Sequence, residues 1–586
     1  VLGAGIVPEA LRVRVALLGS FTVEPFVPFL RIEGARAGLW LEPYVAPYAQ
    51  YMLELLNRDS GLYRHAPQVT FVLLDDDVLS DMRWASGEPP DASTLAAELV
   101  HPVCDALSAF RSAGSGIVVM NDLVAMRQDV TGTFAFRSNR SATQLLAHAN
   151  DLLQSELGRH EGSYLFPLSD VVSQLGRAHA FNYRTHYMGH VSWSDALMAE
   201  VARRYAGIAA AAVGQTTKCI VLDLDNTLWG GVLGELGAEG IAIGPQRPGR
   251  EFLDFQRQLL ELNQLGILLA VCSKNNEGEA LHVLREHPDC LVREQHVAAH
   301  RINWRDKATN LAELASELNI GLAHMLFIDD SPHERAWVRQ QLPEVVVPDP
   351  PADPSWYAAW LPTLPSLTVL RHTAEDARRT QQYHEERERK RLSLEVHSQE
   401  DFLRALQLRV QIEPVTSTSI ERVAQLLAKT NQFNLTTRRH DATTLRRHIA
   451  SGSWRVYTMR VTDRFGDFGL TGVAIAVAGP ERWHLDSFLM SCRVIGKSVE
   501  SALLAAIARD ARRAGAHELT AEFIDSGRNA PASELLPAHG FTRRDDGLFV
   551  RTLDDGGPAW PDWITDGTRT THNDSGITAV PRGVPA

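Results

Sequence analysis

The chain has 586 residues, of which 45% are apolar and 22% charged, and its formal net charge is −13. Such a length predicts several domains, and the acidic balance argues against a nucleic-acid-binding protein. No apolar run reaches the roughly 18 residues that a membrane span needs, the first residues show no secretory signal, and the five cysteines form no C-x-x-C pair. We therefore expect a cytoplasmic protein that binds neither membranes nor nucleic acid and has no disulfide framework and no zinc site.

The first region, residues 1–214, alternates strand-like and helix-like segments. Apolar runs in VRVALLGSFT, QVTFVLLDDDVL and SGIVVMND predict strands, with helical patterns between them. This alternation indicates a parallel α/β sheet. The region also resembles an SGNH hydrolase, with Ser20 at the place of the nucleophile and His186 or His190 as its base. Because GSFT is not GDS and no D-x-x-H follows, we expect a non-catalytic scaffold.

The second region, residues 215–370, contains an unusual pair of carboxylates. Its predicted strands KCIVLDLD, GILLAVCSK and HMLFIDD are nearly all apolar, as expected for parallel strands buried on both faces. Asp223 and Asp225 end the first of them, where α/β sheets place ligands. One carboxylate can attack while the other transfers a proton, and Mg²⁺ can neutralise both. The pattern predicts magnesium-assisted phosphoryl transfer with a carboxylate nucleophile.

The same region holds further polar residues that suit phosphoryl transfer. Ser273 follows the second strand, Lys307 lies in INWRDKATN, and Asp329 and Asp330 end the third strand. These motifs, in this order, resemble the haloacid dehalogenase (HAD) superfamily. About 50 residues separate Asp223 from Ser273, which is too few for a large cap domain. We therefore expect a capless, Rossmann-like HAD domain with an open site.

The HAD resemblance implies a role for each of these residues. Asp223 would be the nucleophile and Asp225 the general acid/base. Mg²⁺ would be held by Asp223, by the backbone carbonyl of Asp225, and by Asp329 or Asp330. The residues implied in binding phosphate and substrate are Thr227, Ser273, Lys274, Asn275 and Lys307.

The remaining chain divides into a charged segment, a third domain and a tail. Residues 371–397 predict a solvated linking helix, and residues 554–586, rich in Gly, Pro, Asp and Thr, predict disorder. Residues 398–553 mix helices and strands and resemble an acetyltransferase-like (GNAT) α+β domain. RVIGKS resembles the turn that cradles coenzyme A, although Ser498 replaces the usual glycine or alanine. We expect this domain to dock a carrier arm, with acetyltransferase activity and a purely structural role as the alternatives. The candidate residues are Asn431, Asn434, Cys492, Arg493, Gly496 and Lys497.

The sequences of several motifs resemble one particular family within the HAD superfamily. DLDNTLWGGVLGELGAEGI, AVCSKNNE, FIDDSPHERAWV and KTNQFNLTTRRH look like the FkbH-like family of polyketide biosynthesis, and the resemblance covers nearly the whole chain. It implies transfer of a D-glyceryl unit from 1,3-bisphosphoglycerate to the phosphopantetheine thiol of an acyl carrier protein, with loss of phosphate. The N-terminal domain would then be a scaffold or a docking surface for the carrier protein.

A thioester route calls for a thiol near the phosphate site. Cys272 directly precedes Ser273 and is a candidate acyl carrier; alternatively it is a small core residue, because neighbouring residues of a strand face opposite sides. Cys492 is the rival acyl carrier. Two other functions remain open: a plain phosphatase on a small phosphorylated metabolite, which needs no carrier protein, and a scaffold with a decayed site.

Overall fold

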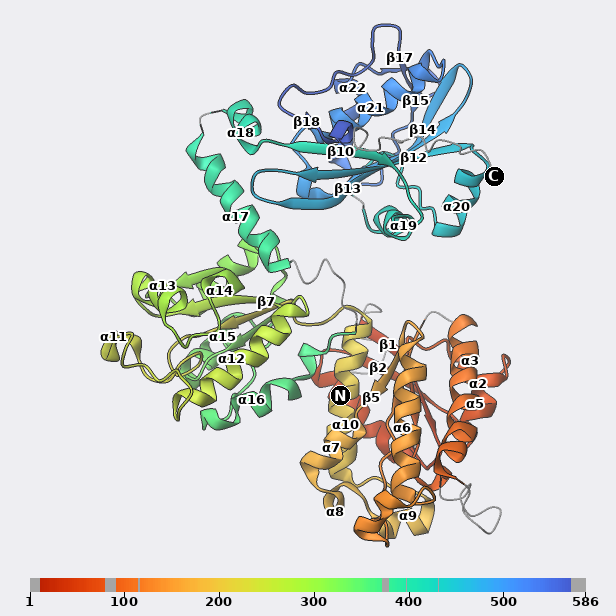
Figure 1. Cartoon of the computed structure of the whole chain (residues 1–586), viewed down its shortest axis with the longest axis vertical. Helices are drawn as coiled ribbons and strands as arrows, with labels where there is room; N and C mark the ends of the chain where they lie inside the picture. Colours follow the sequence, from red (N-terminus) through yellow and green to blue (C-terminus); the bar gives the residue numbers. More distant parts are fainter. Residues whose placement is uncertain are drawn as a thin grey trace, which may run out of the picture. The chain divides into compact units, whose positions relative to one another are not determined.

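The structure is a computed structural model (Figure 1). It divides into two compact units, Val1–Thr380 and Gln381–Ala586. Within the described residues, no helix is long and apolar enough to cross a membrane. The residues that the structure describes are 11–79, 91–113, 116–370, 379–396, 398–430, 432–527 and 529–570.

The first unit begins with a parallel sheet of five strands in the order β2-β1-β3-β4-β5. Strands β3 and β4 are buried at every residue, which explains why their sequences are apolar except for Thr70 and Asn121. Helices cover both faces of the sheet: α1, α7 and α10 pack on one, and α5 and α6 on the other. The prediction of a parallel α/β fold is confirmed. The strands are β1 (Arg12–Gly19), β2 (Trp40–Val45), β3 (Val69–Leu73), β4 (Ile117–Asn121) and β5 (Ser163–Phe166), and the helices are α1 (Val27–Arg36), α2 (Tyr51–Leu56), α3 (Gly61–His65), α5 (Ala92–Ala113), α6 (Ala142–Gly158), α7 (Leu168–Leu175), α8 (Arg177–Ala180), α9 (Tyr183–Gly189) and α10 (Asp195–Ala212).

A second parallel sheet completes the first unit, with the order β8-β7-β6-β9. Strands β6, β7 and β9 are buried throughout. Only the short helix α11 and the helix α12 lie between β6 and β7, so no cap domain is inserted there, as predicted. The strands are β6 (Cys219–Leu222), β7 (Leu268–Ser273), β8 (Val297–Ile302) and β9 (Met325–Ile328), and the helices are α11 (Leu233–Leu236), α12 (Gly249–Gln264), α13 (Glu277–Glu286), α14 (Lys307–Glu317), α15 (Pro332–Gln341) and α16 (Tyr357–Trp360).

The second unit is an α+β fold built on one mostly antiparallel sheet. Its order is β16-β17-β15-β14-β13-β12-β10-β18, and β11 pairs with β14. Among the described residues of this unit, only the pairs β14·β15 and β10·β18 are parallel. Helix α21 packs in the main core of this unit. The strands are β10 (Arg409–Pro414), β11 (Phe433–Asn434), β12 (Trp454–Thr462), β13 (Asp467–Ala478), β14 (Arg482–Met490), β15 (Glu518–Ala521), β16 (Thr542–Arg543), β17 (Phe549–Thr552) and β18 (Thr565–Asp566), and the helices are α17 (Arg379–Glu395), α18 (Gln399–Leu406), α19 (Ile420–Lys429), α20 (Ala442–Ala450), α21 (Val499–Arg513) and α22 (Leu535–Ala538).

The charged segment differs from the expected solvated linker. Helix α17 buries Arg389, whose guanidinium donates to both oxygens of Asp463 at 2.6 and 3.0 Å. The same guanidinium lies 4.0 Å from the ring centre of Phe468. A charge removed from water must be paired, and here the pairing fixes the helix to the second unit. The many charged residues of this segment led to the prediction of a fully solvated helix, although one face of the helix packs against the second unit.

The prediction of disorder from residue 554 onward is wrong for residues 554–570. Strand β18 pairs with β10, Ile564 is buried, and Trp560 and Trp563 pack against the core of the second unit. Burial of these apolar side chains offsets the conformational entropy that the segment loses when it folds. The Gly and Asp residues around them do not provide such burial. Residues 571–586 of the predicted tail lie outside the described residues.

Candidate functional site

The predicted polar residues of the second sheet meet at its carboxyl edge. Strands β6 and β9 are paired in parallel, with Leu222 opposite Ile328, so the aspartates that follow them become neighbours. Asp223, Ser273, Lys307 and Asp329 are all buried. Parallel strands end at one edge of a sheet, and this geometry explains why motifs far apart in the sequence form one site.

Lys307 links two of the carboxylates. Its Nζ lies 2.7 Å from Oδ2 of Asp223 and 2.5 Å from Oδ2 of Asp329. Burial lowers the pKa of Lys307, but the two carboxylates outweigh burial and hold the pKa above its ordinary value. Burial and the charge of Asp223 raise the pKa of Asp329 to about 6, although Lys307 opposes the shift. Lys307 is therefore the cation that makes this concentration of negative charge tolerable.

The same edge offers a set of ligands for a divalent cation. Asp223, Asp329 and Asp330 each present a carboxylate oxygen, and the three oxygens lie within 4.8 Å of one another. Hard oxygen ligands of this kind suit Mg²⁺. Arg335 fixes the loop, because its guanidinium donates to the backbone carbonyls of Asp329 and Asp330 at 2.7 Å each. Sequence reasoning missed Arg335, which lies one helical turn after the DD motif.

Asp225 is oriented by three donors. Its Oδ1 accepts from Trp229 Nε1 at 2.9 Å and from the backbone N–H of Leu233 at 3.1 Å, and its Oδ2 accepts from Asn275 Nδ2 at 3.0 Å. Asn275 also donates to Ser273 Oγ at 3.3 Å. Asn275 therefore joins the end of β7 to the D-x-D turn, while Trp229 and Leu233 were not predicted from the sequence.

The remaining predicted phosphate ligands have different surroundings. The hydroxyl oxygens of Thr227 and Ser273 are buried at the strand ends, and Thr227 Oγ1 accepts from the backbone N–H of Asp330 at 3.2 Å. Lys274 forms an ion pair with Glu334 at 2.6 Å. A phosphate bound by Lys274 would therefore have to compete with this carboxylate.

Cys272 has the properties of a core residue. Its side chain is fully buried, its thiol contacts the backbone carbonyl of Lys307 at 3.8 Å, and burial raises its pKa well above the ordinary value. A thiolate nucleophile needs the opposite environment. Cys492 begins a short 3₁₀ helix, Cys492–Val494, in the second unit.

The other candidate carrier-arm residues also lie in the second unit. Gly496 has a positive φ of 79°, and the Lys497 ammonium lies 5.5 Å from the ring centre of Phe468. The Arg493 guanidinium donates to Ser491 Oγ at 3.3 Å. Asn434 is buried and accepts from the backbone N–H of Thr437 at 2.9 Å, as a turn residue does. Asn431 lies outside the described residues.

The candidate SGNH-type residues are joined only indirectly. The Ser20 hydroxyl donates to Asp75 at 2.9 Å, and His186 Nδ1 lies 3.1 Å from the hydroxyl of Ser192. The ring centre of His190 is 6.0 Å from that of His186. Because the Ser20 proton goes to a carboxylate rather than to an imidazole, this arrangement does not activate the hydroxyl as a nucleophile.

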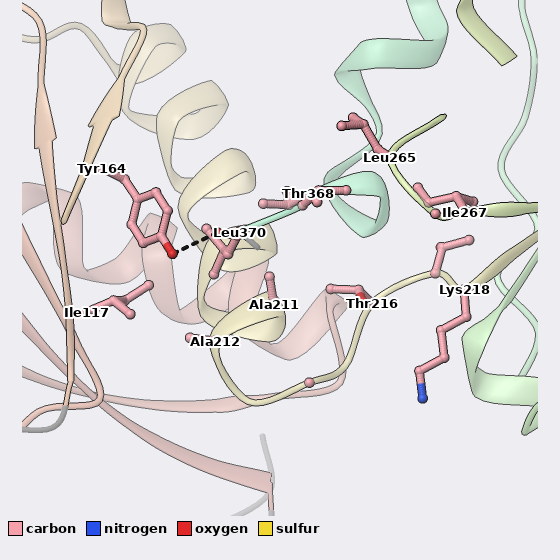
Figure 2. Close-up of a pocket in the computed structure, with 14 residues that line it drawn as sticks. Ile117, Tyr164, Ala211, Ala212, Thr216, Lys218, Leu265, Ile267, Thr368 and Leu370 are labelled. Carbon is pink, nitrogen blue, oxygen red and sulfur yellow. Dashed lines mark hydrogen bonds between the residues drawn. The ribbon is translucent and has the colours of Figure 1, made fainter. Parts of the chain in front are cut away.

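A pocket elsewhere in the first unit is not part of the candidate site. Figure 2 shows that Ile117, Ile267 and Lys218 line it, at the amino ends of β4, β7 and β6. The Tyr164 hydroxyl donates to the carbonyl of Leu370 across it, at 2.8 Å. Asp223 follows β6 at the opposite, carboxyl end of the strand, so this pocket does not reach the acidic cluster.

Comparison with known proteins supports the assignment of the first unit. The N-terminal part of BF1531 from Bacteroides fragilis, which contains a phosphatase domain and was crystallised in complex with Mg, is 29% identical, with a TM-score of 0.57, and the match covers 61% of this chain and 95% of that chain. No protein-family model and no curated protein matches the chain. The parallel sheet, its strand-end residues and this likeness together support phosphatase chemistry of the HAD type.

Acetyltransferase structures also match, over about a quarter of the chain. A putative acetyltransferase of the GNAT family from Desulfovibrio desulfuricans is 16% identical, with a TM-score of 0.21, over 25% of this chain and 99% of that one. The ribosomal-protein-S18-alanine N-acetyltransferase from Escherichia coli is 15% identical, with a TM-score of 0.20, over 26% of this chain and 99% of that one.

Proposed function

We propose that this protein transfers a D-glyceryl unit from 1,3-bisphosphoglycerate to the phosphopantetheine thiol of an acyl carrier protein and removes phosphate at Asp223. The observation that carries the phosphate chemistry is the buried Asp223, 2.7 Å from Lys307 and beside the carboxylates of Asp329 and Asp330. The proposals of a glyceryl substrate and of a carrier-protein acceptor depend on the resemblance of the sequence motifs to the FkbH-like family.

The residues fit a phosphoryl transfer to a carboxylate. Asp223 attacks phosphorus and Lys307 holds the phosphate oxygens against it. Asp225 protonates the leaving oxygen and later takes the proton of the attacking water. Asp223, Asp329 and Asp330 would hold Mg²⁺, the ion in the BF1531 complex, and Mg²⁺ would neutralise charge on the phosphate.

The carrier protein supplies the accepting thiol. Its sulfur attacks the acyl carbon, the carbon–oxygen bond to the C1 phosphate breaks, the C1 phosphate leaves with the thiol proton, and a thioester forms. The phosphorus that Asp223 attacks is therefore that of the remaining C3 phosphate. No cap domain lies between β6 and β7, so a substrate attached to a macromolecule can approach this edge. The buried thiol of Cys272 favours direct transfer to the carrier protein over a relay through that cysteine.

A plain phosphatase acting on a small phosphorylated metabolite is the second candidate function. The likeness to the phosphatase domain of BF1531 favours it, and it needs neither a carrier protein nor a protein thiol. The two functions share Asp223 and differ in where the three-carbon unit goes.

Intact-protein mass spectrometry distinguishes the two functions. The full chain is mixed with Mg²⁺, freshly generated 1,3-bisphosphoglycerate and a phosphopantetheinylated carrier protein, beside Asp223→Asn and the control Asp151→Asn, an exposed position on α6. We expect a glyceryl mass on the carrier with the native chain and the control. Phosphate release without a mass on the carrier would favour the phosphatase. With Asp223→Asn we expect the carrier to gain a phosphoglyceryl mass, and an unchanged glyceryl mass without the phosphoryl group would refute the mechanism.

A further inference from the structure

The carboxyl edge of the N-terminal sheet carries polar residues that the proposed reaction does not use. Its strand order reverses between β1 and β3, which are paired in parallel. Ser20 follows β1, and the run Asp75, Asp76, Asp77 follows β3. In open α/β sheets the crevice at such a reversal is where ligands bind.

Three side chains at this edge have the spacing of metal ligands. Asp75, Asp77 and His186 each offer one ligand atom, and these atoms lie within 4.8 Å of one another. His186 Nε2 is 3.3 Å from Asp77 Oδ2. Two ligands bound at about 2.0–2.1 Å to one tetrahedral ion are roughly 3.4 Å apart, so this pair already has the separation that a shared ion requires.

The hydrogen bonds around His186 fix which nitrogen is free for a metal. The Ser192 hydroxyl donates to Asp75 Oδ2 at 3.0 Å, so it accepts from His186 Nδ1, 3.1 Å away. In the neutral imidazole, the Nδ1 proton leaves the lone pair on Nε2, the atom that faces Asp77. A metal-binding histidine is commonly oriented in this way through its other nitrogen. His186 is 4% exposed, which limits the freedom of the ring.

A cationic group already lies against that lone pair. The Arg127 guanidinium is 3.2 Å from His186 Nε2. Arg127 lies between β4 and α6, in a different part of the chain from the three proposed ligands. Arg127 is exposed, so its side chain can move into solvent when a metal ion takes the position. A guanidinium on the imidazole nitrogen beside Asp77 indicates that this point of the edge favours positive charge.

We propose that Asp75, Asp77 and His186 bind a divalent transition-metal ion of the zinc class. Imidazole nitrogen with carboxylate oxygen suits Zn²⁺, whereas the all-oxygen set at Asp223 suits Mg²⁺. Three protein ligands leave a fourth position for water or a ligand, which is the pattern of catalytic rather than structural zinc. The first unit therefore has two metal sites of different chemistry.

Calorimetric titration of the full chain with Zn²⁺ in excess Mg²⁺ tests this site, because Mg²⁺ fills the oxygen site at Asp223. We expect one tight Zn²⁺ per chain. His186→Ala and Asp77→Asn should each weaken binding by about 10- to 100-fold, with folding checked by circular dichroism. Arg127→Ala should retain the binding or tighten it, since it removes a competing cation.

Two control variants test whether Zn²⁺ binding depends on the proposed ligands rather than on a nearby histidine or on the acidic site at Asp223. His190→Asn should leave Zn²⁺ binding unchanged, and asparagine tolerates the positive φ of 53° at that position. Asp223→Asn should also retain the Zn²⁺, so loss of the proposed reaction would not count against this site. No tight Zn²⁺ in the native chain, or equal binding by folded His186→Ala and Asp77→Asn, would overturn the proposal.

Discussion

The two parallel sheets of the first unit collect carboxylates at the same edge but balance them differently. At the second sheet, Asp223 and Asp329 share the buried ammonium of Lys307. At the first sheet, the carboxylate of Asp75 accepts from the hydroxyls of Ser20 and Ser192. One edge has a buried cation between its carboxylates. The other surrounds Asp75 with neutral donors and has an exposed guanidinium, that of Arg127, only beside the imidazole of His186.

The groups that balance the carboxylates at each edge indicate which ligand that edge can bind. A fixed lysine between two carboxylates pre-organises a site for a phosphate and a hard cation, because positive charge is already in place. Neutral donors around a buried carboxylate leave its charge unbalanced, so the folded protein favours either protonation or a bound cation. The same topology thus yields two kinds of site, and removing the counter-charge should have unequal effects.

The largest effect is expected from Lys307→Met. Removing one partner of a buried ion pair leaves uncompensated carboxylates, at a cost of about 3–5 kcal/mol, and it removes a cation from the phosphate. Steady-state phosphate release should fall by about a thousand-fold or more. Lys274→Met is the matched variant: Lys274 is paired with Glu334, and we expect a loss of about ten-fold. Equal losses in the two variants would mean that the Lys307 triad has no special role.

Asp225→Asn should give the next largest effect. The amide keeps the shape of the side chain but cannot transfer a proton, so turnover should fall by about a hundred-fold or more. Hydrolysis of the aspartyl phosphate needs this group as a base, and a phosphoryl mass should accumulate on the chain, detectable by quenched intact-mass measurement. The double variant with Asp223→Asn should show no such mass; a phosphoryl mass that remains would place the nucleophile elsewhere.

Local patterns in the sequence sufficed to predict the second sheet and the residues at its strand ends. Asp223, Ser273 and Asp329 follow apolar runs, and parallel strands bring their carboxyl ends to one edge. The spacing of Asp223 and Ser273 also predicted the absence of a cap. These conclusions depend only on periodicity, strand direction and segment length.

Long-range partners could not be predicted in this way. Nothing in the local sequence of Arg389 indicates that it pairs with Asp463, or that Ser192 joins Asp75 to His186. Such pairs depend on which surfaces meet in the fold. The two tryptophans that anchor residues 554–570 were outweighed by the Gly and Asp around them, because composition averages over a segment whereas packing depends on single side chains.

Asp122 tests the first sheet by its response to pH. Burial raises its pKa, although hydrogen bonds from Ser169 oppose the shift. The folded state therefore holds its proton more tightly than the unfolded chain, and this part of the stability falls as the pH rises above about 3.8 through the folded pKa. Asp122→Asn should stabilise the first unit at pH 7 by about 1.4 kcal/mol for each unit of pKa shift, with the gain shrinking toward pH 4.

The measurement is the urea unfolding midpoint of native and variant chains between pH 4 and pH 7. Asp170→Asn, at an exposed position of α7, should show no such trend. A gain from Asp122→Asn that is equal at pH 4 and pH 7 would contradict the electrostatic cause, since protonation abolishes the charge difference between the two side chains.

Cys272 and Ser273 give the smallest and sharpest test, because adjacent residues of β7 face opposite sides of the strand. Cys272→Ala removes one buried sulfur from the core, so we expect stability to fall by about 1 kcal/mol while the rate of carrier acylation changes less than about two-fold. Ser273→Ala removes a hydroxyl at the phosphate site and should reduce that rate by about ten-fold or more. If Cys272→Ala abolished acylation in a folded chain, the acyl group would pass through this thiol despite its burial, and the site would have to open during turnover.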